Sequence, residues 1–150
     1  MRLPTLGQLP GRIATGGFIL HSGLQKWPGD EQTAAGIHGM AAGAFPFLNG
    51  VPPARFLKML SVAEIGTGTA LLVPLVPTAL AGAALTAFSG GLVAMYARTP
   101  GLRNPGSIWP SENGLAVSKD VWMLGMGLGF LLDEWTRTRR SGTSTGVSLR

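Results

Sequence analysis

Two ionisable side chains fall inside apolar stretches of the sequence, His21 in the first stretch and Glu64 in a later one. On insertion scales such a group costs about 2.5 to 3.5 kcal/mol inside a membrane span, so a partner or a function must offset it. A histidine and a glutamate that meet in an apolar pocket can take up and release protons beside a bound molecule. If the first span runs outward and the second inward, both side chains lie in the outer half of the membrane at similar depth.

Further charged residues gather on the same side. The outer ends of the predicted spans carry Lys26, Lys58, Arg98, Lys119 and Asp120, whereas the inner half offers no ionisable group in its apolar stretches. This one-sided distribution predicts an outward-facing pocket in which Lys26 and Arg98 steer anions. The candidate pocket residues are His21, Lys26, Glu64, Arg98, Lys119 and Asp120.

Each of these residues also has a structural interpretation. Glu64 can accept hydrogen bonds from Ser61, from a neighbouring span or from Lys26, and so fix helix register. His21 can be a packing histidine that donates to a backbone carbonyl, while Asp120 suits the first turn of a helix. A metal site would need His21, His38 and Glu64 to converge, and because their spacing offers no local ligand pair we predict none.

The composition places these residues in a lipid environment. Of the 150 residues, 13% are charged, against about 25% in ordinary soluble domains, and there are 23 glycines and no cysteine. So few charges exclude a disordered chain and argue against a water-exposed globule, and the lack of cysteine excludes disulfides and thiol chemistry. The net charge of +5 does not indicate nucleic acid, because the one basic cluster, Arg137 to Arg140, directly follows an apolar run.

The apolar runs predict an all-α integral membrane four-helix bundle, which forms a single domain over residues 1–140. The expected spans are residues 8–26, 54–73, 76–97 and 115–135, and Pro74 and Pro77 bracket a tight turn between the middle two. Residues 33–48 predict a short connector helix at the interface or on the mouth of the bundle. Residues 99–114 predict an irregular loop, and residues 141–150 a polar cytoplasmic tail. Basic residues are equally frequent on both sides, but the dense Arg137–Arg140 cluster favours cytoplasmic placement of both termini.

Small residues are expected to hold the helices together, because close backbone approach drives helix association in lipid. The candidate packing glycines are Gly39, Gly43, Gly66, Gly68, Gly125, Gly127 and Gly129. The Gly-x-Gly-x-Gly run at the end of this list is no phosphate loop, since no strand precedes it and no Lys-Ser/Thr pair follows.

One stretch carries a family resemblance. The segment RIATGGFILHSGLQKW resembles the opening of the DoxX family of small bacterial membrane proteins, with matching residues Arg12, Gly16, Phe18, His21, Gly23 and Lys26. A connector helix rich in small residues, the Ala63-Glu64 pair with Gly68, and the Lys119-Asp120 pair are also similar. The third-to-fourth loop is long and Pro-rich, which departs from the family pattern. The resemblance implies four spans in a bacterial inner membrane and association with oxidoreductase assemblies, some of them quinone-linked.

Two functions follow as hypotheses. In the first, the chain is a membrane subunit that organises an oxidoreductase or envelope assembly and has no catalysis of its own. In the second, the outward pocket binds a small amphipathic molecule such as a quinone, although no cofactor is evident from the sequence itself. The expected partners are the lipid bilayer, other membrane proteins and this ligand, but not nucleic acid. A transporter has less support, because the sequence has no repeat or pair of broken helices.

Overall fold

The computed structural model describes residues 3–143, which form helices joined by turns and loops. Within that range the chain forms α1 (Leu9–Lys26), α2 (Glu31–Ala44), α3 (Pro53–Leu72), α4 (Thr78–Arg98), α5 (Leu115–Ser118) and α6 (Asp120–Thr143), with two 3₁₀ helices at Pro46–Gly50 and Glu112–Gly114 and no strand. The all-α prediction is therefore confirmed.

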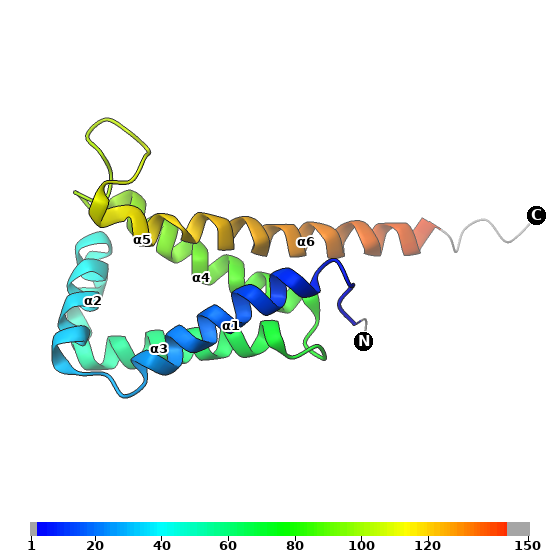
Figure 1. Ribbon diagram of the computed structural model, residues 1–150, viewed down its shortest axis with the longest axis horizontal. Helices are drawn as coiled ribbons and strands as arrows, with labels where there is room; N and C mark the ends of the chain where they lie inside the picture. The colour runs from blue at the N-terminus through cyan, green and yellow to red at the C-terminus, as the bar shows by residue number, and fades with distance from the viewer. Residues whose placement is uncertain (1–2, 144–150) are drawn as a thin grey trace, which may run out of the picture.

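The long helices are arranged as two antiparallel pairs, α1 with α3 and α4 with α6 (Figure 1). Helix α2 crosses one end of the assembly, where it packs against α3 and α4 and where the loop between α4 and α5 also lies. We call this the α2 end. The beginning of α1 and the far part of α6 lie at the opposite, terminal end, and α6 extends past the other helices there.

Local sequence signals explain where the helices begin and turn. The Asp30 side chain accepts from the backbone N–H of Thr33 at 2.7 Å, which caps the first turn of α2. Hydrogen bonds from the Thr33 backbone and hydroxyl groups lower the pKa of Asp30 below its usual value. Pro53 opens α3, and the turn between α3 and α4 closes with a hydrogen bond from Val76 N to Val73 O of 3.1 Å. Proline thus ends and restarts the helices as predicted.

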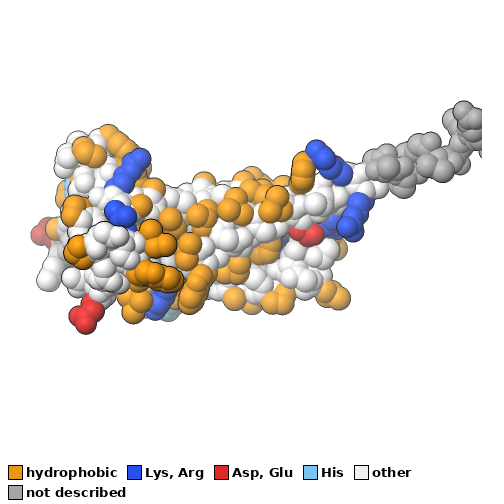
Figure 2. Space-filling model, turned by 90° about the horizontal axis from the view of Figure 1, so that it is seen from above, with side chains coloured by type: hydrophobic (Ala, Val, Ile, Leu, Met, Phe, Trp, Pro, Cys, Tyr) orange, Lys and Arg blue, Asp and Glu red, His pale blue; other side chains and the backbone are white. Residues whose placement is uncertain are grey.

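Several polar side chains are buried beside the apolar core of Ile19, Leu71 and Leu85, and many large apolar side chains are exposed. Ser61 and Ser89 are fully enclosed, and Arg12 is 1% exposed. Large apolar side chains on the long helices point outward, including Phe18 at 67% exposure and Leu80 at 61%. Figure 2 shows hydrophobic side chains over the middle of the visible face, with Lys and Arg toward the two ends. This pattern suits a protein whose surroundings are apolar.

One helix of the described part, Thr78–Arg98, is long and apolar enough to cross a membrane by length and composition. The prediction of four spans goes beyond this finding, because charged or polar residues and glycines lower the hydropathy of α1, α3 and α6. The predicted windows nevertheless locate the helices well: residues 8–26, 54–73 and 76–97 each agree with an observed helix to within two residues.

The fourth window, residues 115–135, differs more from the structure. A break at Lys119 separates the short α5 from α6, and α6 continues to Thr143 rather than ending near Trp135. The predicted tail, residues 141–150, therefore begins inside a helix, and its residues 144–150 lie outside the described range. Strong helix formers such as arginine allow the helix to continue beyond the apolar run.

Glycine positions two close helix contacts. A Cβ placed on Gly68 would lie 2.6 Å from the backbone nitrogen of Leu20, and one on Gly127 would lie 2.6 Å from Thr86 Oγ1. Gly16 and Gly23 of α1 and Gly82 of α4 are similarly crowded. At Gly39, Gly43, Gly66, Gly125 and Gly129, an added Cβ would meet nothing within 4 Å, so these five glycines do not bring helices of this chain together.

Candidate functional site

Glu64 is buried between α3 and α1 near the α2 end, with 6% of its surface exposed. Its Oε1 atom lies 3.0 Å from Lys26 Nζ and accepts from Ser22 Oγ at 3.2 Å. Lys26 is the last residue of α1, where a cation also interacts favourably with the helix dipole. Glu64 is thus held by two side chains one helical turn apart on α1.

Lys26 has a full set of acceptors. Its ammonium group donates to Ser22 Oγ at 2.6 Å, to Glu64 Oε1 at 3.0 Å and to Ser22 O at 3.4 Å. A lysine ammonium group has three N–H donors, so these contacts use all of them. The Lys26 ammonium group therefore has no donor left for a further partner.

The other carboxylate oxygen of Glu64 has no such partner. Among the described residues, Glu64 Oε2 is the one buried side-chain oxygen or nitrogen without a hydrogen-bond partner. An enclosed acceptor that remains unpaired costs about 1 to 3 kcal/mol, and more when it is charged. The site therefore has an unmet demand for a hydrogen-bond donor.

Glu64 and Lys26 form one wall of an apolar cavity of about 380 Å³. The cavity lies among four helices, because α1 supplies Lys26, α2 and α3 supply most of the lining, and α4 supplies the remainder. The lining consists of Thr33, Gly36, Ile37, Met40, Leu60, Leu92 and Met95 in addition to the ion pair. An apolar cavity with a single polar corner is typical of sites for small amphipathic molecules.

The structure brings together part of the predicted pocket. Lys26 and Glu64 pair directly, and Asp120 at the start of α6 is partly buried and interacts electrostatically with both of them. His21 is exposed on α1, so the expected meeting of His21 with Glu64 does not occur. The physical reason is helix geometry: the face of α1 toward α3 carries Ser22 and Lys26, and His21 lies about 100° away from Ser22.

Arg98 and Lys119 lie at the same end of the bundle but do not line the cavity. The Arg98 guanidinium is exposed and sits 5.1 Å from the Phe45 ring centroid, and Lys119 is exposed at the break before α6. Both residues lie at helix ends, outside the cavity, and contribute charged surface at the α2 end.

Ser61 and His38, the residues with expected structural roles, make contacts with backbone carbonyls. Ser61 donates to Gly23 O at 2.7 Å, so it stabilises the α1–α3 contact and leaves Glu64 to Ser22 and Lys26. His38 contacts Leu48 O at 3.0 Å and packs edge-on against Phe56. Within residues 3–143 no three His, Asp or Glu side chains gather as a metal site would require.

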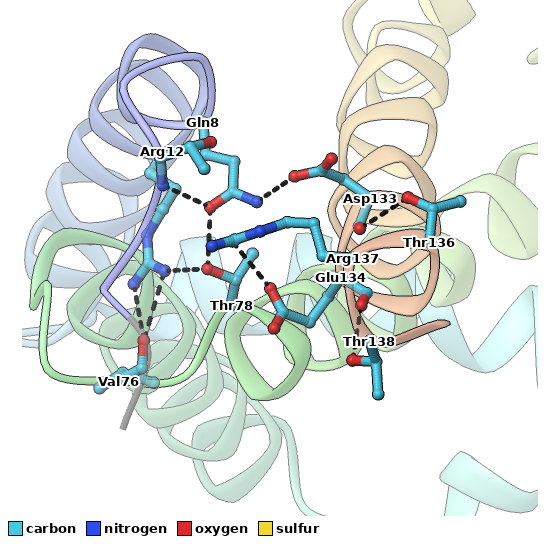
Figure 3. A network of polar contacts seen from close by, with 10 residues as sticks. Gln8, Arg12, Val76, Thr78, Asp133, Glu134, Thr136, Arg137 and Thr138 are labelled. Atoms are coloured by element: carbon cyan, nitrogen blue, oxygen red, sulfur yellow. Dashed lines mark hydrogen bonds and ion pairs between the residues drawn. The ribbon is translucent and has the colours of Figure 1, made fainter. Parts of the chain in front are cut away.

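A second polar cluster lies at the terminal end, and the expectation of an inner half without ionisable groups is wrong. Figure 3 shows Arg12 of α1 pointing to the turn that joins α3 to α4. Its guanidinium donates to Leu71 O at 2.8 Å, Ala70 O at 2.9 Å, Val73 O at 3.0 Å and Thr78 Oγ1 at 3.2 Å. Arg12 thus satisfies carbonyls that the end of α3 leaves without intrahelical donors.

The same cluster ties the two helix pairs together. Thr78 donates to Gln8 Oε1 at 3.0 Å, and Gln8 in turn donates to Asp133 of α6. The signal for this cluster was present in the sequence as an arginine within an apolar window. Most acceptors of Arg12 are backbone carbonyls, however, and no residue type in the sequence marks those.

Comparison with protein-family models, curated proteins and solved structures finds no match to this chain.

Proposed function

We propose that the chain is a multi-pass membrane protein whose cavity at the α2 end binds a small amphipathic, quinone-like molecule. The proposal rests on Glu64, which lines the apolar cavity and whose buried Oε2 atom has no hydrogen-bond partner among the described residues. A buried ionised group without a complete set of partners is rarely retained for stability alone.

The membrane assignment rests on where polar and apolar side chains lie. Large apolar residues are exposed on α1, α3, α4 and α6, while the buried positions include Arg12, Ser61 and Glu64 beside an apolar core. In the proposal all four long helices cross a bacterial inner membrane, in keeping with the resemblance to the DoxX family. Both ends of the described chain lie at the terminal end, which fits an even number of crossings with cytoplasmic termini.

In this site, the ion pair with Lys26 fixes the orientation of the Glu64 carboxylate in an apolar environment. The carboxylate then offers a single fixed acceptor to a ligand whose ring packs among Ile37, Leu60 and Leu92. Recognition would come from the polar corner, and most of the affinity from apolar burial at about 25 cal/mol per Å².

Ligand binding to the wild type is compared with binding to a variant whose cavity is filled by a larger side chain. Detergent-purified wild type is titrated anaerobically with duroquinone and with durohydroquinone, and binding of at least one of them is expected. Leu92→Trp fills the cavity and should abolish binding. Leu80→Trp, on the exposed side of the same helix, is the matched control and should bind as wild type does. Binding that is equal in Leu92→Trp and wild type would contradict the proposal.

A second candidate is the role of membrane subunit in an oxidoreductase or envelope assembly. Gly125 and Gly129 on α6 favour it, because both have open space where a partner helix could approach closely. In this case the chain should co-purify with a partner in mild detergent, and Gly129→Leu should release that partner. Recovery of the wild-type chain alone under the same conditions would argue against this candidate.

A further inference from the structure

We infer that the occupant of the cavity must be a hydrogen-bond donor, so that the site selects a hydroxyl-bearing molecule over a carbonyl-bearing one of the same shape. This inference rests on the proposed function, since it names the chemical class of ligand for the same cavity. It follows from counting the hydrogen-bond donors and acceptors of Ser22, Lys26 and Glu64, which form the polar corner of the cavity.

The donors at this corner are already used. All three ammonium hydrogens of Lys26 have acceptors on Ser22 and Glu64, and the Ser22 hydroxyl donates to Glu64 Oε1. A ligand that offers only carbonyl oxygens would have to break one of these bonds in order to be recognised. The ion pair would then lose a contact and the ligand would gain one, with no net benefit.

The acceptor at this corner is free. Glu64 Oε2 has less than 1 Å² of accessible surface and no partner among the described residues, so an occupant of the cavity reaches it when the Glu64 side chain turns toward the cavity. A carboxylate oxygen there only accepts. A hydroxyl group placed against it forms a charge-assisted hydrogen bond and removes the penalty of the unpaired oxygen. A donating ligand therefore gains the free energy of this hydrogen bond, which a ligand without a donor does not.

The charge of the lining indicates a neutral donor. Lys26 and Glu64 are the two charged residues of the cavity wall and have opposite signs, while the rest of the lining is apolar apart from Thr33. A neutral phenol or hydroquinone leaves the charges of this wall as they are and places no further ion in an apolar space. The site thus fits a lipophilic phenolic molecule, and the oxidised, quinone form fits it poorly.

Two matched ligand pairs test the inference. Durohydroquinone carries two hydroxyl groups where duroquinone carries two carbonyl groups, and thymol methyl ether carries a methyl group in place of the hydroxyl hydrogen of thymol. In wild type, the hydroxyl form of each pair should bind about tenfold or more tightly, the range expected for a hydrogen bond to a charged group. Equal affinity of both members of each pair would overturn the inference, whereas failure of every ligand to bind would remove the proposed function itself.

Variants connect the preference to Glu64. In Glu64→Gln the side-chain amide can donate as well as accept, so the preference for the hydroxyl form should fall to less than about threefold. Glu112→Gln removes an exposed loop carboxylate and should keep the wild-type preference. If Glu64→Gln does not fold, the wild-type ratio for the two ligand pairs still decides the question. A full preference in folded Glu64→Gln would contradict the role assigned to Oε2.

Discussion

Replacing Gly68 by alanine tests the α1–α3 contact that holds the site together. The new Cβ would lie 2.6 Å from Leu20 N and 2.8 Å from Gly16 O, so the helices must separate by about 0.8 Å to reach an ordinary 3.4 Å contact. Overpacking of this kind costs about 3 kcal/mol when backbone has to move. Alanine returns about 1 kcal/mol through helix propensity, which leaves a net destabilisation of about 2 kcal/mol.

Gly66 provides the matched control on the same helix. A Cβ there meets nothing within 4 Å, so Gly66→Ala should gain about 1 kcal/mol from helix propensity. Thermal unfolding in detergent, followed by tryptophan fluorescence, should give a Tm lower than wild type by about 4 to 8 °C for Gly68→Ala. For Gly66→Ala the Tm should rise by about 2 to 4 °C. Equal Tm changes in the two variants would refute the reasoning, because propensity alone would then explain both.

Three further predictions address other contacts. Arg12→Ala leaves the carbonyls of Ala70, Leu71 and Val73 without a donor, so it should lose about 3 kcal/mol or more, while exposed Arg55→Ala stays within about 0.5 kcal/mol in the same unfolding assay. Gly127→Ala should lower the Tm and Gly125→Ala should not, since only the first crowds Thr86; equal values would mean that α4 and α6 are packed differently. Asp30→Asn should lower the Tm at neutral pH, and the difference from wild type should narrow as the pH falls. The pKa of Asp30 is depressed in the folded protein, so its contribution is present above the unfolded pKa of about 3.9 and is lost as the pH falls through the folded value; a difference that does not change with pH would contradict this cap.

Much of the helical layout could be predicted because apolar runs and prolines mark it directly. The windows for α1, α3 and α4 were right to within two residues, since Pro53 and the pair Pro74 and Pro77 interrupt the helices where the sequence suggests. The extension of α6 was missed, because a helix can continue after its apolar run ends and only the run was visible.

The composition of the site was harder to predict, because it depends on which face of each helix meets its neighbour. His21 and Ser22 are adjacent in sequence, yet the rotation of α1 exposes the first and turns the second to Glu64. Gly66 and Gly68 are also close in sequence, yet only Gly68 faces α1 closely enough for an added Cβ to clash. Sequence spacing gives the relative angle of two side chains on one helix, but the absolute rotation comes from packing between helices.

Immersion of the helix bundle in lipid is the central claim, and labelling of single cysteines tests it most directly. The natural chain has no cysteine, so each variant reports one position. Phe18→Cys and Val62→Cys lie on exposed apolar surface, and Asn104→Cys lies in the exposed loop at the α2 end. In membrane vesicles opened to both sides, a charged maleimide should label Asn104→Cys and leave Phe18→Cys and Val62→Cys unlabelled until the membrane is dissolved in denaturant. Labelling of all three positions at similar rates would mean that water, and not lipid, covers the helices.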